Sequence, residues 1–188
     1  MQNEYFFDLK NNFTSQNIGV ALDQLVKPSP YVVVVCIGSD ITIGDSLGPL
    51  VGTLLEKRKI KNIFLYGTLR STVTAKEVIS LSNHIKKFHP YSPIIAVDAA
   101  VGDEKEVGQI KLQNRGLFPG IGVGKKMGCI GDVSIMGIVA RRSKKPYQEL
   151  QTTRLSLIYK QAITIADGIT GFLEGRSHNQ SSSFVHTL

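Results

Sequence analysis

The sequence predicts an α/β fold, a three-layer α/β/α sandwich built around a mainly parallel sheet. Short runs of β-branched and aromatic residues alternate along the chain with longer segments whose apolar residues recur at helical spacing. The most hydrophobic run, Tyr31 to Ile37, has no polar side, as expected for a strand buried on both faces. The 188 residues, 42% of them hydrophobic and 20% charged, suit one domain with a substantial core.

The predicted helices and strands alternate as far as the strand at 93–97, and two further strands then precede the last helix. Helices are expected where apolar residues recur every three or four positions, over residues 15–27, 47–55, 75–88 and 155–172. Strands are expected over residues 31–37, 61–66, 93–97, 106–112 and 132–140. Pro28 and Pro30 end the first helix, and Pro49 falls in the first turn of the second, where its missing N–H costs nothing.

This pattern indicates a single α/β domain over residues 1–175, followed by a polar, Ser-rich tail over 176–188 that we expect to be flexible. No run approaches the ~20 apolar residues that cross a bilayer, so we expect no membrane association. Two cysteines are too few for a disulfide framework or a zinc site, which fits a reducing cytoplasm.

The net charge of +7 could favour nucleic acid or an acidic substrate. The basic residues are dispersed, however, and the densest groups, around Lys57 and Arg141, have no interleaved aromatic residues. We therefore expect a solvated, mildly basic surface and no direct nucleic-acid binding.

Two aspartates follow predicted strands. Asp45 comes after the strand at 31–37, and Asp98 comes directly after the strand at 93–97. Ligands of open α/β sheets bind beyond the carboxyl ends of the strands, so both side chains should lie at that edge. Two close carboxyl groups cannot both ionise easily, and one protonated beside one ionised group is the acid–base pair that activates water against an amide. The pair could instead hold a metal ion, and singly Asp45 could be a helix N-cap and Asp98 a turn residue.

The stretch YGTLRSTVTA at 66–75 provides further candidates for substrate binding. It places Arg70 and Ser71 at a strand-to-helix junction, where Arg70 could bind a substrate carbonyl or carboxylate. Asp40 lies on the turn after the strand at 31–37 and could contact substrate, although a loop-forming role suits it better than a catalytic one.

A glycine-rich stretch, FPGIGVGKKMGCIGD at 118–132, fails the phosphate-binding Walker pattern, because Pro119 stands where the first glycine belongs. We expect Gly120, Gly122 and Gly124 to bind substrate backbone or to lie on a loop that closes over it. The alternative is a plain loop whose glycines supply positive φ angles.

Four stretches together resemble the YyaC family of sporulation proteins, which are described as candidate spore proteases. They extend from about Val32 to Arg141 and read CIGSDITIGDSLGPLVG, YGTLRSTVTA, IIAVDAAVG and GLFPGIGVGKKMGCIGDVSIMGIV. That family is more distantly similar to the germination protease of bacterial spores and to the hydrogenase maturation endopeptidases. The resemblance implies their phosphorylase/hydrolase-like α/β fold, in agreement with the pattern of elements.

The resemblance also implies an endopeptidase in the cytoplasm of sporulating cells, in the mother cell or forespore, acting on small acid-soluble spore proteins or another spore protein. The two essential aspartates of the germination protease, in stretches resembling GDSLGP and VDAA, fall on Asp45 and Asp98. The maturation endopeptidases have a later histidine that helps to bind nickel, whereas the histidines beyond Asp98 here are His178 and His186, in the expected tail.

We accordingly expect no resident metal and no cofactor. Two other functions stay open at this point: a non-catalytic binding protein of sporulation, and a metal-dependent hydrolase resembling the maturation endopeptidases. The sequence also leaves open a homo-oligomer.

Overall fold

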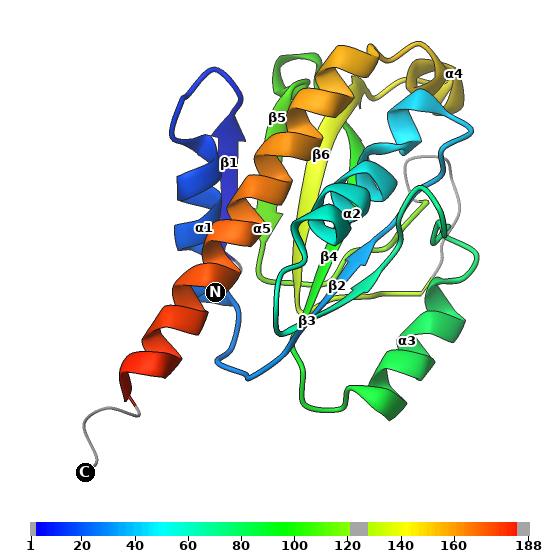
Figure 1. Cartoon of the computed structure of the whole chain (residues 1–188). Coiled ribbons are helices and arrows are strands. Elements are labelled where there is room, and N and C mark those ends of the chain that lie inside the picture. Colours follow the sequence, from blue (N-terminus) through cyan, green and yellow to red (C-terminus); the bar gives the residue numbers. More distant parts are fainter. Residues whose placement is uncertain (1–2, 121–127, 184–188) are drawn as a thin grey trace.

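A six-stranded sheet forms the middle layer of the molecule (Figure 1), in a computed structural model that describes residues 3–120 and 128–183. The strand order is β1-β5-β6-β4-β2-β3. Strands β3, β2, β4 and β6 run parallel, β5 is antiparallel to β6, and β1 is antiparallel to β5. The strands are β1 (Glu4–Asp8), β2 (Val32–Cys36), β3 (Ile63–Tyr66), β4 (Ile94–Gly102), β5 (Gln109–Gln113) and β6 (Val133–Arg141).

Helices cover the two faces of the sheet unequally (Figure 1). Three of them, α1, α2 and α5, lie over one face and enclose the larger hydrophobic core with β2, β4, β5 and β6. Among the described residues, α3 is the one helix in the core of the opposite face. The helices are α1 (Thr14–Leu25), α2 (Leu47–Arg58), α3 (Val78–Phe88), α4 (Pro146–Gln151) and α5 (Leu155–Ser183), with short 3₁₀ turns η1 (Ile43–Asp45) and η2 (Glu104–Glu106). The predicted three-layer sandwich with a mainly parallel sheet is confirmed.

Strand β2 shows why the hydrophobic pattern predicts this architecture well. All five of its side chains are buried, because β3 and β4 flank it and helices cover both faces. Odd-numbered Val33 and Val35 contact the core under α3, whereas even-numbered Val34 and Cys36 contact the core under α2 and α5. A strand in this position needs apolar side chains on both sides.

Four elements differ from the prediction. The N-terminal strand β1 and the short helix α4 were not predicted, and β4 continues past Asp98 to Gly102. Helix α5 extends beyond residue 175, where a tail was expected, and ends at Ser183. Arg176 holds this part of the helix against α1 and the residues after it. Its guanidinium donates hydrogen bonds to the Val26 and Lys27 carbonyls and pairs with Asp23. No helix in the described ranges is long and apolar enough to span a bilayer.

Candidate active site

Asp98 lies where strand β2 has ended and β4 continues. Cys36, the last residue of β2, pairs with Val97, so Asp98 is the first residue of β4 beyond that neighbour. Alternation along the strand turns Ala96 and Asp98 toward the α3 face, away from Ile95 and Val97 in the larger core. Asp98 remains 9% exposed, and the Ala99 backbone N–H donates a 2.8 Å hydrogen bond to its Oδ1.

Asp45 reaches the same edge through a tight turn after β2. The Ser39 N–H donates to the Asp45 backbone carbonyl at 3.0 Å, which folds the segment 39–45 back on itself. Gly38 has φ +143°, and a Cβ there would lie 2.0 Å from that carbonyl oxygen, so this turn requires glycine. Ser46, not Asp45, occupies the N-cap position of α2, and no side chain caps the helix. The Asp45 carboxyl is therefore free of the capping role that the sequence had left open.

Two cavities meet at this pair of carboxyl groups. A smaller one of about 240 Å³ is lined by Thr42, Lys76 and Tyr147 among others, and a larger one of about 670 Å³ extends over β4, β6 and β5. Both are lined by Asp45, Asp98, Gly120 and Leu150. Groups that are 53 positions apart in the sequence thus share one site, as the strand order requires.

The two carboxyl groups differ in their electrostatics. Burial raises the pKa of half-buried Asp45 from 3.8 to about 6, although the Ser39 backbone amide opposes this. Burial also raises the pKa of Asp98 well above its usual range, and the negative charge of Asp45 raises it further, against the opposing Ala99 hydrogen bond. As the pH rises, Asp45 is therefore the carboxyl that ionises first, and Asp98 is the one that holds its proton longer. One proton acceptor and one proton donor then face the same cavities.

The other predicted site residues are placed differently. Gly120, with φ +78°, lines both cavities, whereas Gly122 and Gly124 lie outside the described residues. Asp40, Arg70 and Ser71 are exposed and line neither cavity, and Arg70 pairs with Glu56 at 3.6 Å. The structure does not bring these three residues to the aspartate pair, and their role in binding stays a prediction.

Several lining residues were not found from the sequence. Lys111, Gln113, Arg115 and Arg142 line the larger cavity. The run QIKLQ contained a usable signal, because its polar residues alternate with buried Ile110 and Leu112 and so mark one polar face of a strand. Which strand lay beside it was not predictable, since β5 pairs with β6 and not with its nearer neighbour in sequence, β4.

The side chains at this site can be compared with those that a bound metal ion requires. No group of three or more His, Cys, Asp or Glu side chains in the described parts of the chain is arranged to hold a metal ion. Among the described residues that line the two cavities, Asp45 and Asp98 are those whose side chains are of a type that binds metal ions. Two carboxyl groups do not match the three or four protein ligands typical of a resident transition metal.

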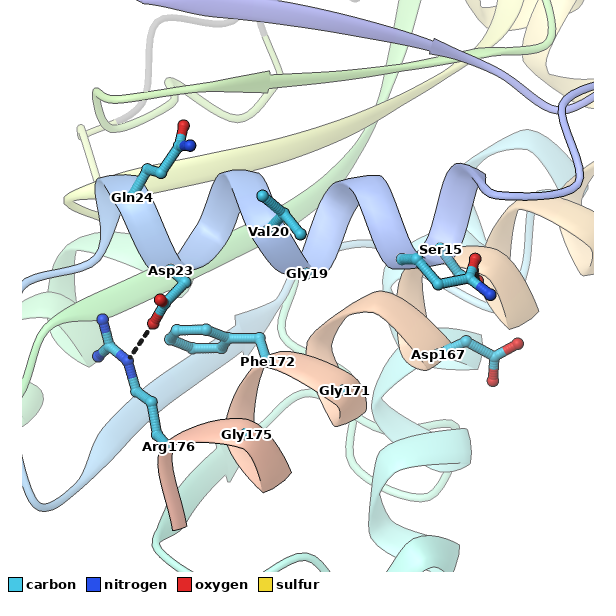
Figure 2. Close-up of a pocket in the computed structure, with 11 residues that line it drawn as sticks. Ser15, Gly19, Val20, Asp23, Gln24, Asp167, Gly171, Phe172, Gly175 and Arg176 are labelled. Carbon is cyan, nitrogen blue, oxygen red and sulfur yellow. Dashed lines mark hydrogen bonds and ion pairs between the residues drawn. The ribbon is translucent and has the colours of Figure 1, made fainter. Parts of the chain in front are cut away.

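A separate cavity of about 580 Å³ lies between α1 and α5 (Figure 2). Gly19, Gly171 and Gly175 line it, and a Cβ added at Gly171 or Gly175 would meet nothing within 4 Å. Its charged residues include Asp23 and Arg176, which pair with each other at 3.1 Å, as the dashed line in Figure 2 marks. These groups are engaged in holding the helices together, which favours the aspartate pair as the reactive site.

The fold of the chain is similar to that of a solved hydrogenase maturation protease. The crystal structure of the [NiFe] hydrogenase maturation protease HycI from Thermococcus kodakarensis KOD1 matches it with a TM-score of 0.53. That match covers 82% of this chain and 99% of HycI at 17% sequence identity, and it shows the fold.

Sequence comparison gives the family. The model of the family described as "Protein of unknown function (DUF1256)" matches residues 6–168, and the chain belongs to this family. The chain is also 42% identical over 139 residues to the "Uncharacterized protein YyaC" of Bacillus subtilis (strain 168), an alignment that covers 74% of this chain and 68% of YyaC. The resemblance to the YyaC family that the four stretches indicated is confirmed.

Proposed function

We propose that this protein is an endopeptidase that uses Asp45 and Asp98 to activate water against a peptide bond. The observation that carries the proposal is the shared position of the two carboxyl groups at the meeting point of two cavities, where Asp98 holds its proton to higher pH than Asp45. The fold shared with a maturation protease supports it as an analogy.

Each carboxyl group has one role in this reaction. The ionised Asp45 accepts a proton from a water molecule while the water oxygen forms its bond to the scissile carbonyl carbon. The protonated Asp98 donates a hydrogen bond to the carbonyl oxygen and stabilises the negative charge that develops there. When the carbon–nitrogen bond breaks, the amine leaves with a proton from the pair, and the two carboxyl groups again share a single proton.

The proposed substrate is a protein of the sporulating cell, with small acid-soluble spore proteins as the first candidates, in the cytoplasm of the mother cell or forespore. This part rests on the likeness of GDSLGP and VDAA to stretches of the germination protease. A cleft assembled from two cavities of about 240 and 670 Å³ suits a peptide that passes over the aspartates with residues on either side.

The test is incubation of the purified chain with a small acid-soluble spore protein, with fragments identified by mass spectrometry. We expect cleavage by the wild type and loss of at least about 100-fold in Asp45→Asn and in Asp98→Asn. Glu174→Gln, an exposed change on α5, is the matched control and should cleave normally. Normal cleavage by either aspartate variant would remove that residue from the mechanism.

The same experiment separates the two alternative functions. Tight binding of the substrate without fragments would identify a binding protein in place of a peptidase. Loss of cleavage with a chelator, restored by an added metal ion, would identify a metal-dependent hydrolase. Cleavage that is unchanged by the chelator is the expected result for a carboxyl pair that acts directly on water.

A further inference from the structure

The α3 face of the sheet is covered by a helix over only part of its width. Helix α3 packs over β2 and β4 through Val78 and Ile85, in the smaller core. The larger cavity lies over the rest of this face, where Met136 of β6 and Lys111 of β5 line it. Leu117 and Phe118 line it as well, so the open part of the face is a groove with apolar and polar surfaces.

The strand register links this groove directly to the proposed reactive pair. Asp98 is opposite Met136, and Met136 is opposite Lys111, so the three residues form one row across β4, β6 and β5. Neighbouring strands lie ~4.8 Å apart, which places the Lys111 backbone about 10 Å from that of Asp98. An extended peptide advances ~3.3 Å per residue, so about three residues cover this span.

Two cations lie at the β5 end of the row. Lys111 stands in the row itself and Arg115 follows two residues after Gln113, and both line the cavity, whereas Arg142 lies past the opposite end of β6, beside Gly102. Glu4 on β1 accepts ion pairs from Lys111 at 3.0 Å and from Arg115 at 2.9 Å, and these partners lower its pKa. Two cations against the single carboxylate of Glu4 leave one surplus positive charge at this end of the groove.

Gln113 adds an independent sign that a ligand belongs here. Its side chain is 5% exposed, it lines the same cavity, and its buried Oε1 has no hydrogen-bond partner in the described structure. A buried acceptor left unsatisfied costs about 1–3 kcal/mol, so such groups usually have a partner. An N–H group of a bound peptide is a fitting partner for this amide oxygen, which lines the groove over the sheet.

We propose that the groove over β6 and β5 binds a carboxylate of the substrate peptide at Lys111 and Arg115, about three residues from the bond at Asp98, with a peptide N–H donating to Gln113 Oε1. The carboxylate is either an acidic side chain or the C-terminus of the substrate. The inference rests on the proposed function, because it takes the aspartate pair as the reacting centre.

The test measures binding separately from cleavage. Three fluorescein-labelled octapeptides of Ala, Ser and Gly are titrated by fluorescence anisotropy at low salt. One has a central Glu and an amidated C-terminus, one has Gln in place of Glu, and one has the central Gln with a free C-terminal carboxylate. We expect at least fivefold tighter binding of one carboxylate peptide than of the neutral one, and which peptide binds identifies the source of the carboxylate.

Variants assign the effect to the groove. The double variant Lys111→Gln/Arg115→Gln should reduce the preference below twofold, whereas Lys144→Gln, an exposed lysine that lines neither cavity, should keep it. Gln113→Leu should weaken all three peptides by a similar factor and leave their ratio unchanged, with Gln113→Met as a second variant if the first is poorly folded. Far-UV circular dichroism checks the folding of each.

The inference fails if the three peptides bind equally, if none binds, or if the preference persists in the double variant. Failure of the peptidase proposal gives a different result. A carboxylate preference without cleavage of any peptide or spore protein would support the proposed binding groove and refute the proposed peptidase activity. Cleavage of a spore protein without any carboxylate preference would support the peptidase activity and refute the binding groove.

Discussion

Asp45→Asn should make the folded protein more stable at neutral pH although it removes the proposed proton acceptor. Burial raises the pKa of Asp45 in the folded state from 3.8 to about 6. The folded chain therefore holds the proton to a higher pH than the unfolded chain does, and ionisation of Asp45 opposes folding. The free energy of unfolding of the wild type therefore falls as the pH rises from about 4 to about 6, and this decrease is complete above that window.

The size of the effect follows from the pKa. One pKa unit corresponds to about 1.4 kcal/mol, so the full penalty at pH 7 is about 3 kcal/mol. Asp45 is half-buried and partly reached by solvent, which reduces the expected gain to about 1–2 kcal/mol. For a chain of this length, that gain corresponds to an increase in Tm of about 2–8 °C.

The assay is thermal and urea unfolding of wild type, Asp45→Asn and Glu174→Gln at pH 3.5 and pH 7. The stabilisation by Asp45→Asn should be present at pH 7 and absent at pH 3.5, where the wild-type carboxyl is protonated in both states. Glu174 is exposed on α5, so Glu174→Gln controls for the loss of one negative charge. An Asp45→Asn variant no more stable than Glu174→Gln at pH 7, or equally stabilised at both pH values, would refute the account of a buried, ionised Asp45.

Two further predictions concern the same site. In the proposed reaction Asp45 is ionised and Asp98 is protonated. The kcat/KM for a cleaved spore protein should therefore rise with pH through about 6 and fall at higher pH, as the pair loses its second proton. A profile that is flat from pH 5 to pH 8 would contradict this expectation. Gly38→Ala should destabilise the fold by at least about 2 kcal/mol in urea unfolding, because its φ of +143° and the Asp45 carbonyl oxygen leave no space for a Cβ. Gly171→Ala, where a Cβ meets nothing within 4 Å, is the matched control and should leave stability unchanged or slightly higher.

The sequence predicted the centre of the sheet well because local signals are strong there. The run at 32–36 is apolar on both sides, and the helical spacing after Leu47 has a clear apolar face. The position of Asp45 and Asp98 at one edge followed from a general property of parallel sheets and not from any long-range contact. Their joint placement could therefore be predicted from two short segments.

The prediction was incomplete where structure depends on pairing between distant segments. Strand β1 is an edge strand with alternating exposure, and its partner β5 lies more than 100 residues later in the chain. Residues Ala99 to Gly102 contain small side chains with weak strand preference, and β4 extends through them because β6 pairs alongside. The cations of the larger cavity come from segments on both sides of the glycine-rich stretch, so no local motif marks them.

The contact between α2 and the strands beneath it has a consequence for divergence within the family. A Cβ at Gly48 would lie 2.0 Å from the Ile37 carbonyl oxygen, and one at Gly52 would lie 1.8 Å from that of Gly67. These are contacts between main-chain atoms, so they set how closely α2 approaches the ends of β2 and β3. Relatives that keep this close approach should therefore preserve these two glycines even where the apolar residues of their interiors have changed.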